Sequence, residues 1–347
     1  MDLRSLIISP DLLRFISEID EFKGGWSVQH NINPERLRSL RHVATIESIG
    51  SSTRIEGSKL SDSDIEGLLS QVGNTSFETR DEQEVAGYAE VMETVFESFA
   101  DIPISENYIK QLHSQLLRHS DKDTRHKGEY KKHSNSVEAF DPRGESLGIV
   151  FETSTPFDTP RETQELLAWT RESLEDKSYH PLIVIALFNV TFLAIHSFQD
   201  GNGRLSRVLV NLLLLKAGYS YIPYASLESI VEKNKDAYYL ALQRTQKTLK
   251  SDNIDWHPWL NFFLLSLKRQ KDHLVEKTSS SNYSDLPFES MLIMQYVDEH
   301  LRITISDAEK LIDTVSRPTI KNRLTDLVKR GLLKRNGKAR GTWYCKS

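Results

Sequence analysis

One apolar run, from Leu182 to Ile195, constrains the fold more than any other stretch of this chain. It is interrupted only by Asn189 and Thr191, and it is shorter than the roughly 20 residues that an α-helix needs to cross a bilayer. A helix that is apolar on all sides lies inside a protein core rather than at its surface. The run therefore predicts a helix buried on every side, around which a helical protein packs.

A loop with unusual chemistry follows this helix directly. Gly201 and Gly203 allow a tight turn and a close approach of ligand to backbone, and a helix expected from about Arg204 would offer free N–H groups and the positive end of its dipole to an anion. Arg204 and Arg207 place two guanidinium groups on one face, at the helix end where cations are least favoured. The loop therefore predicts a phosphate site. Its residues are His196-Ser197-Phe198-Gln199-Asp200-Gly201-Asn202-Gly203-Arg204-Leu205-Ser206-Arg207.

Two further side chains of this loop suit nucleotide chemistry. Asp200 can give one carboxylate to a Mg²⁺ ion that takes its other ligands from phosphates and water. His196 ends the buried helix, and its ordinary pKa near ~6.5 suits a general base. The two side chains could also be ligands of another metal, although no third ligand has a recognisable spacing. Each residue alone has an ordinary structural explanation, and the combination favours a nucleotide site.

The rest of the chain predicts a mainly α-helical cytoplasmic protein. A single cysteine, Cys345, excludes a disulfide framework and favours a reducing compartment. The N-terminus lacks the basic and apolar segments of a signal peptide, and we expect no membrane contact. Helical patterns fill residues 1–105, including a long one over about 35–57, and they continue through 106–275.

Residues 135–152 differ from the helical surroundings. Two short segments rich in β-forming residues flank the turn signal Asp141-Pro142-Arg143-Gly144 and predict a β-hairpin. Two strands alone are marginal in water. We therefore expect the hairpin to lie on another part of the protein or to await a partner strand.

A polar, serine-rich stretch over 276–286 predicts a linker to a second unit, 287–347. There, three helical patterns precede two strand patterns, the order of a small α+β winged helix-turn-helix domain. From residue 311 onward the chain holds ten Lys or Arg residues and two Asp residues. DNA binding through the helix Thr319–Lys329 and contact with a protein partner or a second copy both stay open. Polar residues near the start of that helix are Lys321, Asn322 and Arg323.

The loop after the apolar helix resembles the signature of the Fic (Fido) family, His-x-Phe-x-Asp/Glu-Gly-Asn-Gly-Arg-x-x-Arg, at all eight specified positions. The resemblance covers about residues 35–265. It implies a Fic/Fido helical fold in which the hairpin 135–152 is a flap that aligns a target segment as an added strand. Other segments similar to the family are Gly128-Glu129-Tyr130-Lys131, Leu212–Gly218 and Asp236-Ala237-Tyr238-Tyr239.

The resemblance implies a protein adenylyltransferase (AMPylator), which moves AMP from ATP to a Ser, Thr or Tyr hydroxyl of a target protein or of itself. His196 would be the catalytic base, Asp200 would hold Mg²⁺, and Phe198 would anchor the loop in the core. Tyr238 and Tyr239 would border the base of the nucleotide, or be core aromatics. The other residues implied to bind ATP are Gly201, Asn202, Gly203, Arg204 and Arg207.

Two other functions remain as alternatives. The same site could transfer another nucleotide or a phosphate group. The chain could also be a regulator that binds DNA or a partner and retains only vestigial catalysis.

The segment Ser52-Thr53-Arg54-Ile55-Glu56-Gly57 resembles the family's inhibitory motif, Ser/Thr-x-x-x-Glu-Gly/Asn. The resemblance implies that Glu56 pairs with Arg207 and forces ATP into an unproductive pose; Ser52 and Gly57 are the other specified positions. A carboxylate at the C-terminal end of a helix is unfavourable unless a cation faces it, which agrees with such a pair. In some relatives the same glutamate activates a water that removes AMP, so the resemblance also implies a reverse activity.

Overall fold

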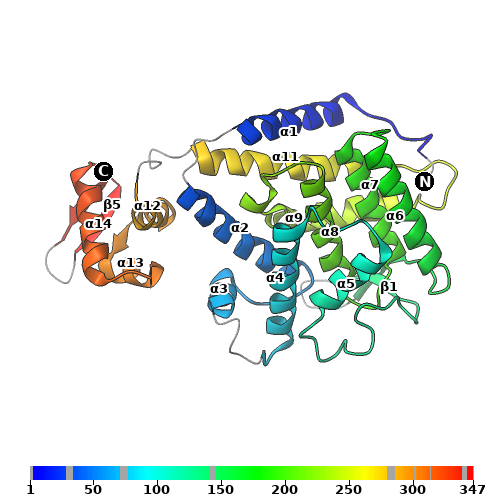
Figure 1. The fold of residues 1–347 in the computed structure, drawn as a ribbon, viewed down its shortest axis with the longest axis horizontal. Helices are drawn as coiled ribbons and strands as arrows, with labels where there is room; N and C mark the ends of the chain where they lie inside the picture. Colours follow the sequence, from blue (N-terminus) through cyan, green and yellow to red (C-terminus); the bar gives the residue numbers. More distant parts are fainter. Residues whose placement is uncertain are drawn as a thin grey trace. The chain divides into compact units, whose positions relative to one another are not determined.

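The structure, a computed structural model, describes residues 3–28, 34–70, 77–140, 146–279, 286–300, 302–312, 314–337 and 342–346. The chain is mainly helical and divides into two compact units (Figure 1). The first unit comprises Met1–His30 and Arg41–Leu274, and the second comprises Asn31–Leu40 and Val275–Ser347. Residues 280–285, the middle of the predicted linker, lie outside the described residues.

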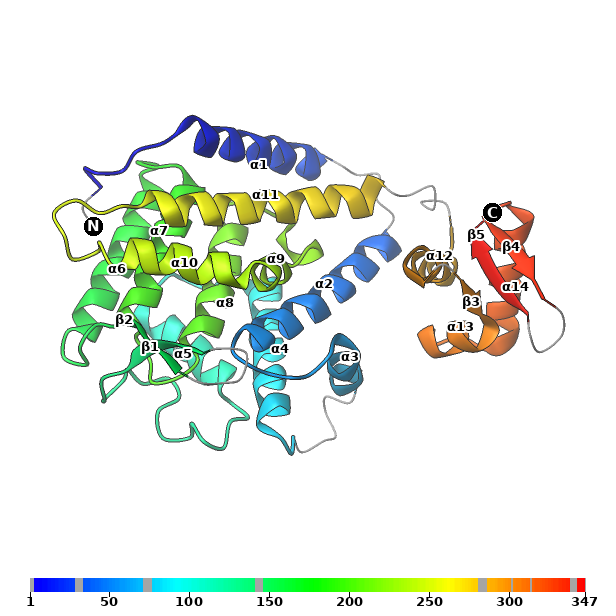
Figure 2. The ribbon, with the colours of Figure 1, turned by 180° about the vertical axis from the view of Figure 1, so that it is seen from behind.

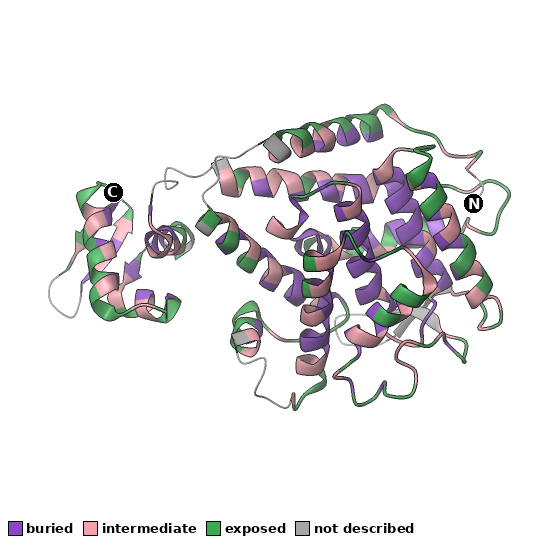
Figure 3. Ribbon diagram, viewed as in Figure 1, coloured by how far each residue is buried: buried purple, intermediate pink, exposed green. Residues whose placement is uncertain are grey.

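Two helices joined by the loop of the segment His196–Arg207, called the motif loop below, form the centre of the first unit. Every residue of α7 (Pro181–Ile195) from Leu182 onward is buried except Thr191 (Figure 3), which confirms the helix predicted from the apolar run. α8 (Asn202–Lys216) is buried from Arg204 to Leu215 because Leu and Val fill most of its positions. α7 packs against α8, α6 (Thr159–Glu175) and α10 (Lys235–Gln246).

The other helices that lie wholly or mostly in the first unit surround this centre. α1 runs alongside α11 in both views (Figures 1 and 2), and an ion pair of 3.2 Å joins Glu18 to Lys268 between them. α2 ends beside the motif loop, where Gly57 takes a positive φ of 106° that only glycine adopts readily. The helices are α1 (Pro10–Val28), α2 (Pro34–Ile55), α3 (Asp62–Ser70), α4 (Arg80–Ser98), α5 (Glu106–Leu116), η1 (Ile222–Tyr224), α9 (Leu227–Lys233) and α11 (His257–Ser279).

The predicted β-hairpin is present. β1 (Ser136–Phe140) pairs antiparallel with β2 (Ser146–Glu152), with Ser136 opposite Glu152 and Phe140 opposite Ser146. Two irregularities interrupt the register, which increases the local twist of the ribbon. The predicted turn falls in 141–145, outside the described residues.

From residue 286 onward, the described residues of the second unit form three helices and a three-stranded antiparallel sheet in the order β3-β5-β4. The three predicted helices and two predicted strands are all found, and the short strand β3 is an addition. Residues 338–341, most of the predicted basic turn, lie outside the described residues. The elements are α12 (Phe288–His300), β3 (Ile303–Thr304), α13 (Ile305–Leu311), α14 (Arg317–Lys329), β4 (Leu333–Asn336) and β5 (Trp343–Lys346).

The second unit has a core of its own. Its helices and strands contribute buried apolar side chains to one cluster, whose fully buried members include Ile293, Met294, Ile320, Leu324 and Leu327. Among the helices described in either unit, none has the length and apolar content needed to cross a membrane.

Candidate functional site

The motif loop starts and ends with a residue in the left-handed backbone conformation. His196 caps the C-terminus of α7 with φ 55° and ψ 60°, and Gly201 precedes α8 with φ 77°. The left-handed conformation costs a non-glycine residue roughly 1–2 kcal/mol. Surrounding contacts must therefore hold His196 in place.

Asn202 and Phe198 hold the loop together from inside. Asn202 Nδ2 donates to the Phe198 carbonyl at 2.7 Å, and Asn202 Oδ1 accepts from the Phe198 N–H at 2.9 Å. Both residues are buried, and Phe198 is fully enclosed. The side chain of Asn202 thus shapes the loop, and only its backbone N–H is left for an anion.

His113 supports the same loop, and sequence reasoning did not identify it. The buried ring stacks on Phe198 with 3.8 Å between centroids. Its Nδ1 accepts from the Gly128 N–H at 2.9 Å, so the proton lies on Nε2, which contacts the Asp200 carbonyl at 3.0 Å. Burial lowers the pKa of His113 to about 4 and keeps it neutral. Its partners are 15 and 87 residues away in the chain, a separation that leaves no local pattern.

His196 is poised as a neutral base. Its Nδ1 lies 3.3 Å from the Leu193 carbonyl, which can only accept, so Nδ1 carries the proton and Nε2 keeps its lone pair. Burial lowers the pKa of His196 to about 4, and Lys131 acts in the same direction. The Leu193 contact and the negative charges of Glu56 and Asp200 act in the opposite direction. At neutral pH the ring can accept a proton at Nε2.

The Asp200 carboxylate is partly open to solvent and surrounded by positive groups. Oδ1 accepts from the Gly201 N–H at 2.6 Å and from Arg204 at 3.3 Å. Arg80 and Lys122 lie 3.7 Å from Oδ2. Burial alone would raise the pKa of Asp200, but Arg204 and the Gly201 N–H outweigh it and lower the pKa.

The residues present fit a weakly held Mg²⁺ ion. Among the described residues, no group of three His, Cys, Asp or Glu side chains is placed to hold a metal. Asp200 offers one carboxylate, and its side chain is 28% exposed. Mg²⁺ is often bound in this way, through one or two carboxylates together with substrate phosphates and water.

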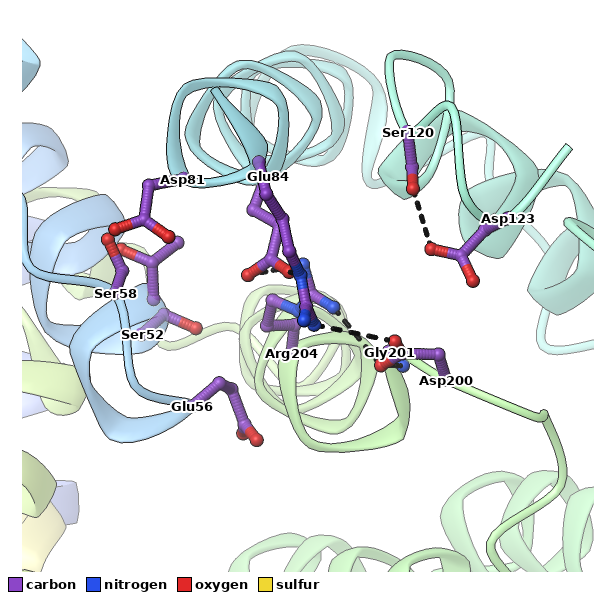
Figure 4. A network of polar contacts seen from close by, with 12 residues as sticks. Ser52, Glu56, Ser58, Asp81, Glu84, Ser120, Asp123, Asp200, Gly201 and Arg204 are labelled. Carbon is purple, nitrogen blue, oxygen red and sulfur yellow. Dashed lines mark hydrogen bonds and ion pairs between the residues drawn. The ribbon is translucent and has the colours of Figure 1, made fainter. Parts of the chain in front are cut away.

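Arg204 is buried between two carboxylates. It lies between Glu84 of α4, at 3.1 Å, and Asp200 of the loop (Figure 4). Glu84 also binds Arg80 at 2.7 Å. The Nε atom of Arg204 is buried and has no hydrogen-bond partner among the described residues. Sequence reasoning did not identify Glu84, which holds Arg204 at the start of α8.

Arg207 is held by the end of α2. Its Nε donates to Ser52 Oγ at 2.8 Å, and its Nη2 donates to the Ser52 carbonyl at 2.9 Å and to Glu56 Oε1 at 2.7 Å. Burial acts to lower the pKa of Arg207, yet Glu56 and neighbouring groups raise it overall. The structure therefore brings Ser52, Glu56 and Arg207 together across about half of the chain.

Glu56 also lies against the first turn of α8 (Figure 4). A side-chain carbon added to Gly203 would collide with Glu56 Oε1, so the carboxylate lies directly over the backbone at Gly203. Burial acts to raise the pKa of Glu56, but Arg207, Arg204 and His196 lower it overall. The carboxylate thus occupies the place where the free N–H groups at the start of a helix attract an anion.

Arg54, two residues before Glu56, fastens the end of α2 to neighbouring helices. Its guanidinium binds both carboxylate oxygens of Glu232 in α9, at 2.7 and 3.1 Å, and Asp62 of α3 at 2.8 Å. Bidentate arginine–carboxylate pairs add geometric specificity to a charge-assisted hydrogen bond. No sequence pattern identifies Glu232 or Asp62 as a partner of Arg54.

The two tyrosines lie in different surroundings. Tyr238 is buried and packs on Trp259 and Phe262, with ring centroids 5.8 and 5.7 Å apart. With Arg207 it lines a cavity of about 30 Å³, which has room for about one or two waters. Burial raises the pKa of Tyr238 to about 12. Tyr239 is partly buried and packs edge-on against Tyr238.

A family comparison agrees with this geometry. Residues 103–214, which include the hairpin and the motif loop, match the sequence model of the Fic/DOC family. The chain is 26% identical over 81% of its length to "Protein adenylyltransferase Fic" of Drosophila mojavensis, and 27% identical over 83% to that of Drosophila virilis. It spans 50% and 53% of these two relatives, about half of their length.

Solved structures share the fold. A Fic family protein from Desulfovibrio desulfuricans G20 has a TM-score of 0.63 and 22% identity, with 99% of this chain and 98% of that chain covered. A Fic domain containing signaling protein from Bacteroides thetaiotaomicron has a TM-score of 0.60 and 23% identity, with 78% and 97% covered.

Proposed function

We propose that this chain is a Fic/DOC family protein adenylyltransferase held in an inhibited state by Glu56; the match of residues 103–214 to the family model supports the assignment. The observation that carries the proposal is the position of Glu56, which lies on Arg207 and over Gly203 at the start of α8. A carboxylate in this place marks an anion site and at the same time blocks it.

In the proposed reaction, His196 Nε2 takes the proton from a Ser, Thr or Tyr hydroxyl of the target. The freed oxygen attacks the α-phosphorus of ATP, the bond from that phosphorus to the bridging oxygen breaks, and pyrophosphate leaves. A positioned base contributes about 10²–10⁴-fold to such a step. The phosphates bring negative charge near His196, which raises its pKa and strengthens it as a base.

The other residues of the loop neutralise and orient the phosphates. The N–H groups at the start of α8 would bind phosphate oxygens, while Arg204 and Arg207 would balance their charge. Asp200 would hold a Mg²⁺ ion, whose chemistry is to neutralise charge on the phosphates. Catalysis of this kind depends mainly on position and charge.

Inhibition follows from competition for Arg207. While Glu56 holds Nη2 of Arg207 and covers Gly203, a phosphate cannot take both contacts. ATP would then bind with its phosphates displaced from His196. The same glutamate could activate water for AMP removal, which we propose as the reverse activity.

The test is intact-mass spectrometry after incubation with ATP and Mg²⁺. We expect Glu56→Gly to raise AMP incorporation by about 5- to 150-fold, the range for a coupling of about 1–3 kcal/mol between two sites. Adding His196→Ala should abolish the gain. Equal labelling of Glu56→Gly and the unmodified chain would remove the inhibition from the proposal. A gain of phosphate instead of AMP would favour the alternative transfer reaction.

The hairpin of β1 and β2 is proposed as the docking place of the target. An added strand would pair with its edge through main-chain hydrogen bonds, which carry little information about target sequence. We therefore propose a protein hydroxyl as the acceptor without naming the target protein.

For the second unit we propose a winged helix with two competing roles, contact with a protein partner or a second copy and binding of DNA. Three of its arginines already pair with acids of the same unit: Arg317 with Glu309, Arg323 with Glu289 and Arg330 with Asp326. In α14 and β4, four other basic side chains are exposed and have no ion-pair partner among the described residues. These are Lys321, Lys329, Lys334 and Arg335.

A further inference from the structure

Lys131, which precedes the hairpin, contacts the chain on both sides of His196. Its backbone N–H donates to the Ser197 carbonyl at 3.0 Å. Its Nζ donates to the Ile195 carbonyl at 2.9 Å. One residue therefore fixes the peptide groups that flank the strained, left-handed His196.

The same ammonium group also holds both ends of the hairpin. Nζ donates to Asn135 Oδ1 at 3.0 Å and to Thr153 Oγ1 at 2.9 Å. Asn135 immediately precedes β1 and Thr153 immediately follows β2. Asn135 in turn donates to the Phe198 carbonyl at 3.0 Å. The three N–H bonds of Lys131 thus join the hairpin to the loop that carries the base.

Burying the ammonium group of Lys131 costs free energy, so a gain in stability alone does not explain these contacts. Lys131 is 3% exposed, and among the described residues no carboxylate lies within ion-pair distance of it. A buried charge without an ion-pair partner is unfavourable unless hydrogen bonds compensate it. Burial lowers the pKa of Lys131 to about 8, while the more distant Glu162 acts to raise it. The group is better explained by what it positions.

We infer that Lys131 is a positioning residue that couples the hairpin to His196, so that a strand docked on the hairpin steadies the catalytic base. The inference rests on the proposed function for the roles of His196 and the hairpin. Its structural half, the coupling of hairpin and loop, is independent of activity.

The coupling is tested by hydrogen–deuterium exchange of three variants of the full chain. Lys131→Met should raise the exchange rates of the hairpin and of residues 196–198 together, by at least about 10-fold, as expected for local opening. Lys131→Arg should stay within a few-fold of the parent. The matched control is Lys216→Met, because Lys216 Nζ also binds carbonyls at a helix end, Phe99 at 3.0 Å and Ala100 at 3.2 Å.

Lys216→Met should leave both segments protected. If Lys131→Met raises exchange uniformly along the chain, or in the hairpin alone, the coupling is absent and the inference is overturned. This outcome does not depend on any catalytic assay.

Kinetics in the Glu56→Gly background then test the positioning role. Lys131→Met should lower kcat for a target by at least about 10-fold, a loss within the range for a misplaced base, with little change in KM for ATP. The charged groups around His196 are Lys131, Glu56 and Asp200. Removing the positive charge of Lys131 should raise the pKa of His196 and move the acid limb of the pH profile to higher pH. Lys131→Arg should restore the pH profile of the parent.

An unchanged kcat and pH profile, with only thermal stability lowered, would show a merely structural lysine and overturn the positioning role. If the Glu56→Gly parent itself transfers no AMP, the proposed function fails. The exchange measurement still decides whether Lys131 couples the hairpin to the loop.

Discussion

His113 and His196 are both kept neutral by burial, but through opposite ring nitrogens. His113 keeps its proton on Nε2, which faces the Asp200 carbonyl, and uses both nitrogens for structure. His196 keeps its proton on Nδ1, facing Leu193, and leaves Nε2 unbonded among the described residues. One backbone contact at Nδ1 decides the role of each ring: the Gly128 N–H makes His113 structural, and the Leu193 carbonyl leaves His196 with a free Nε2 among the described residues.

The pH dependence of activity follows from the lowered pKa of His196. An ordinary histidine loses its base function as pH falls through ~6.5, whereas this one is protonated only at about 4. We expect kcat/KM of Glu56→Gly to stay level from pH 7.5 down to about 5. Removing the negative charge of Glu56 lowers the pKa of His196 further. Glu56→Gly therefore does not move the acid limb of the pH profile to higher pH.

Initial rates of AMP transfer across pH, with circular dichroism at each point to verify folding, measure this. An acid limb centred near 6.5 in a folded protein would mean that burial does not control His196.

At the scale of single residues, local sequence spacing was enough to identify the residues of the site but not the residues that position them. The His196–Arg207 segment is contiguous, and Glu56 lies in a recognisable motif, so both were identified and the structure brings them together. Glu84, His113 and Lys131 act through partners 64 to 120 residues away. Their side chains carry no periodicity or turn signal of their own, and although Lys131 lies in a segment similar to the family, only the fold reveals the contacts that the three residues make.

Among the elements, the end of α2 is the one on which inhibition depends. Glu56 follows the last turn of this helix, and Arg54 fixes that turn to Glu232 and Asp62. The carboxylate is therefore aimed by an ion pair that does not touch the site. α2 carries the inhibitor, and α9 and α3 hold α2.

Loosening this attachment should release inhibition while Glu56 is still present. We expect Arg54→Ala to raise AMP transfer by roughly 2- to 5-fold, since partly exposed ion pairs contribute up to about 1 kcal/mol. In the Glu56→Gly background the same substitution should change the rate less than about 2-fold. Labelling with radioactive ATP measures both rates.

The charge-swapped set Arg54→Glu, Glu232→Arg and Asp62→Asn serves as the control and should restore inhibition, because the last change prevents two carboxylates from facing each other at position 62. An equal rise from Arg54→Ala with and without Glu56 would mean that Arg54 does not act through Glu56.

The sequence was more informative about elements than about their partners. The buried helix, the hairpin and the three C-terminal helices were all predicted because their periodicity is local. β3 was missed because two residues, Ile303 and Thr304, are too few to show alternation. Its pairing with β5, about 40 residues later, is what makes it a strand.

For the whole molecule, the second unit decides whether the chain also contacts DNA. We expect a gel shift with duplex DNA at low salt that weakens as salt rises, with a slope of about −0.9 per neutralised phosphate. Lys334→Glu with Arg335→Glu should weaken binding similarly for all sequences. Arg330→Ala is the matched control, because Asp326 already neutralises it. Absence of a shift at low salt would leave partner or dimer contact as the role.

The pairing of Glu56 with Arg207 has a consequence for the chain as a whole. The competitor of the phosphate belongs to the same molecule, so its local concentration is set by the chain and not by the amount of protein. Dilution cannot relieve the inhibition, and the apparent affinity for correctly bound ATP is reduced by the fraction of molecules in which Glu56 is displaced. A partner that pulls on α2 would change that fraction without touching ATP.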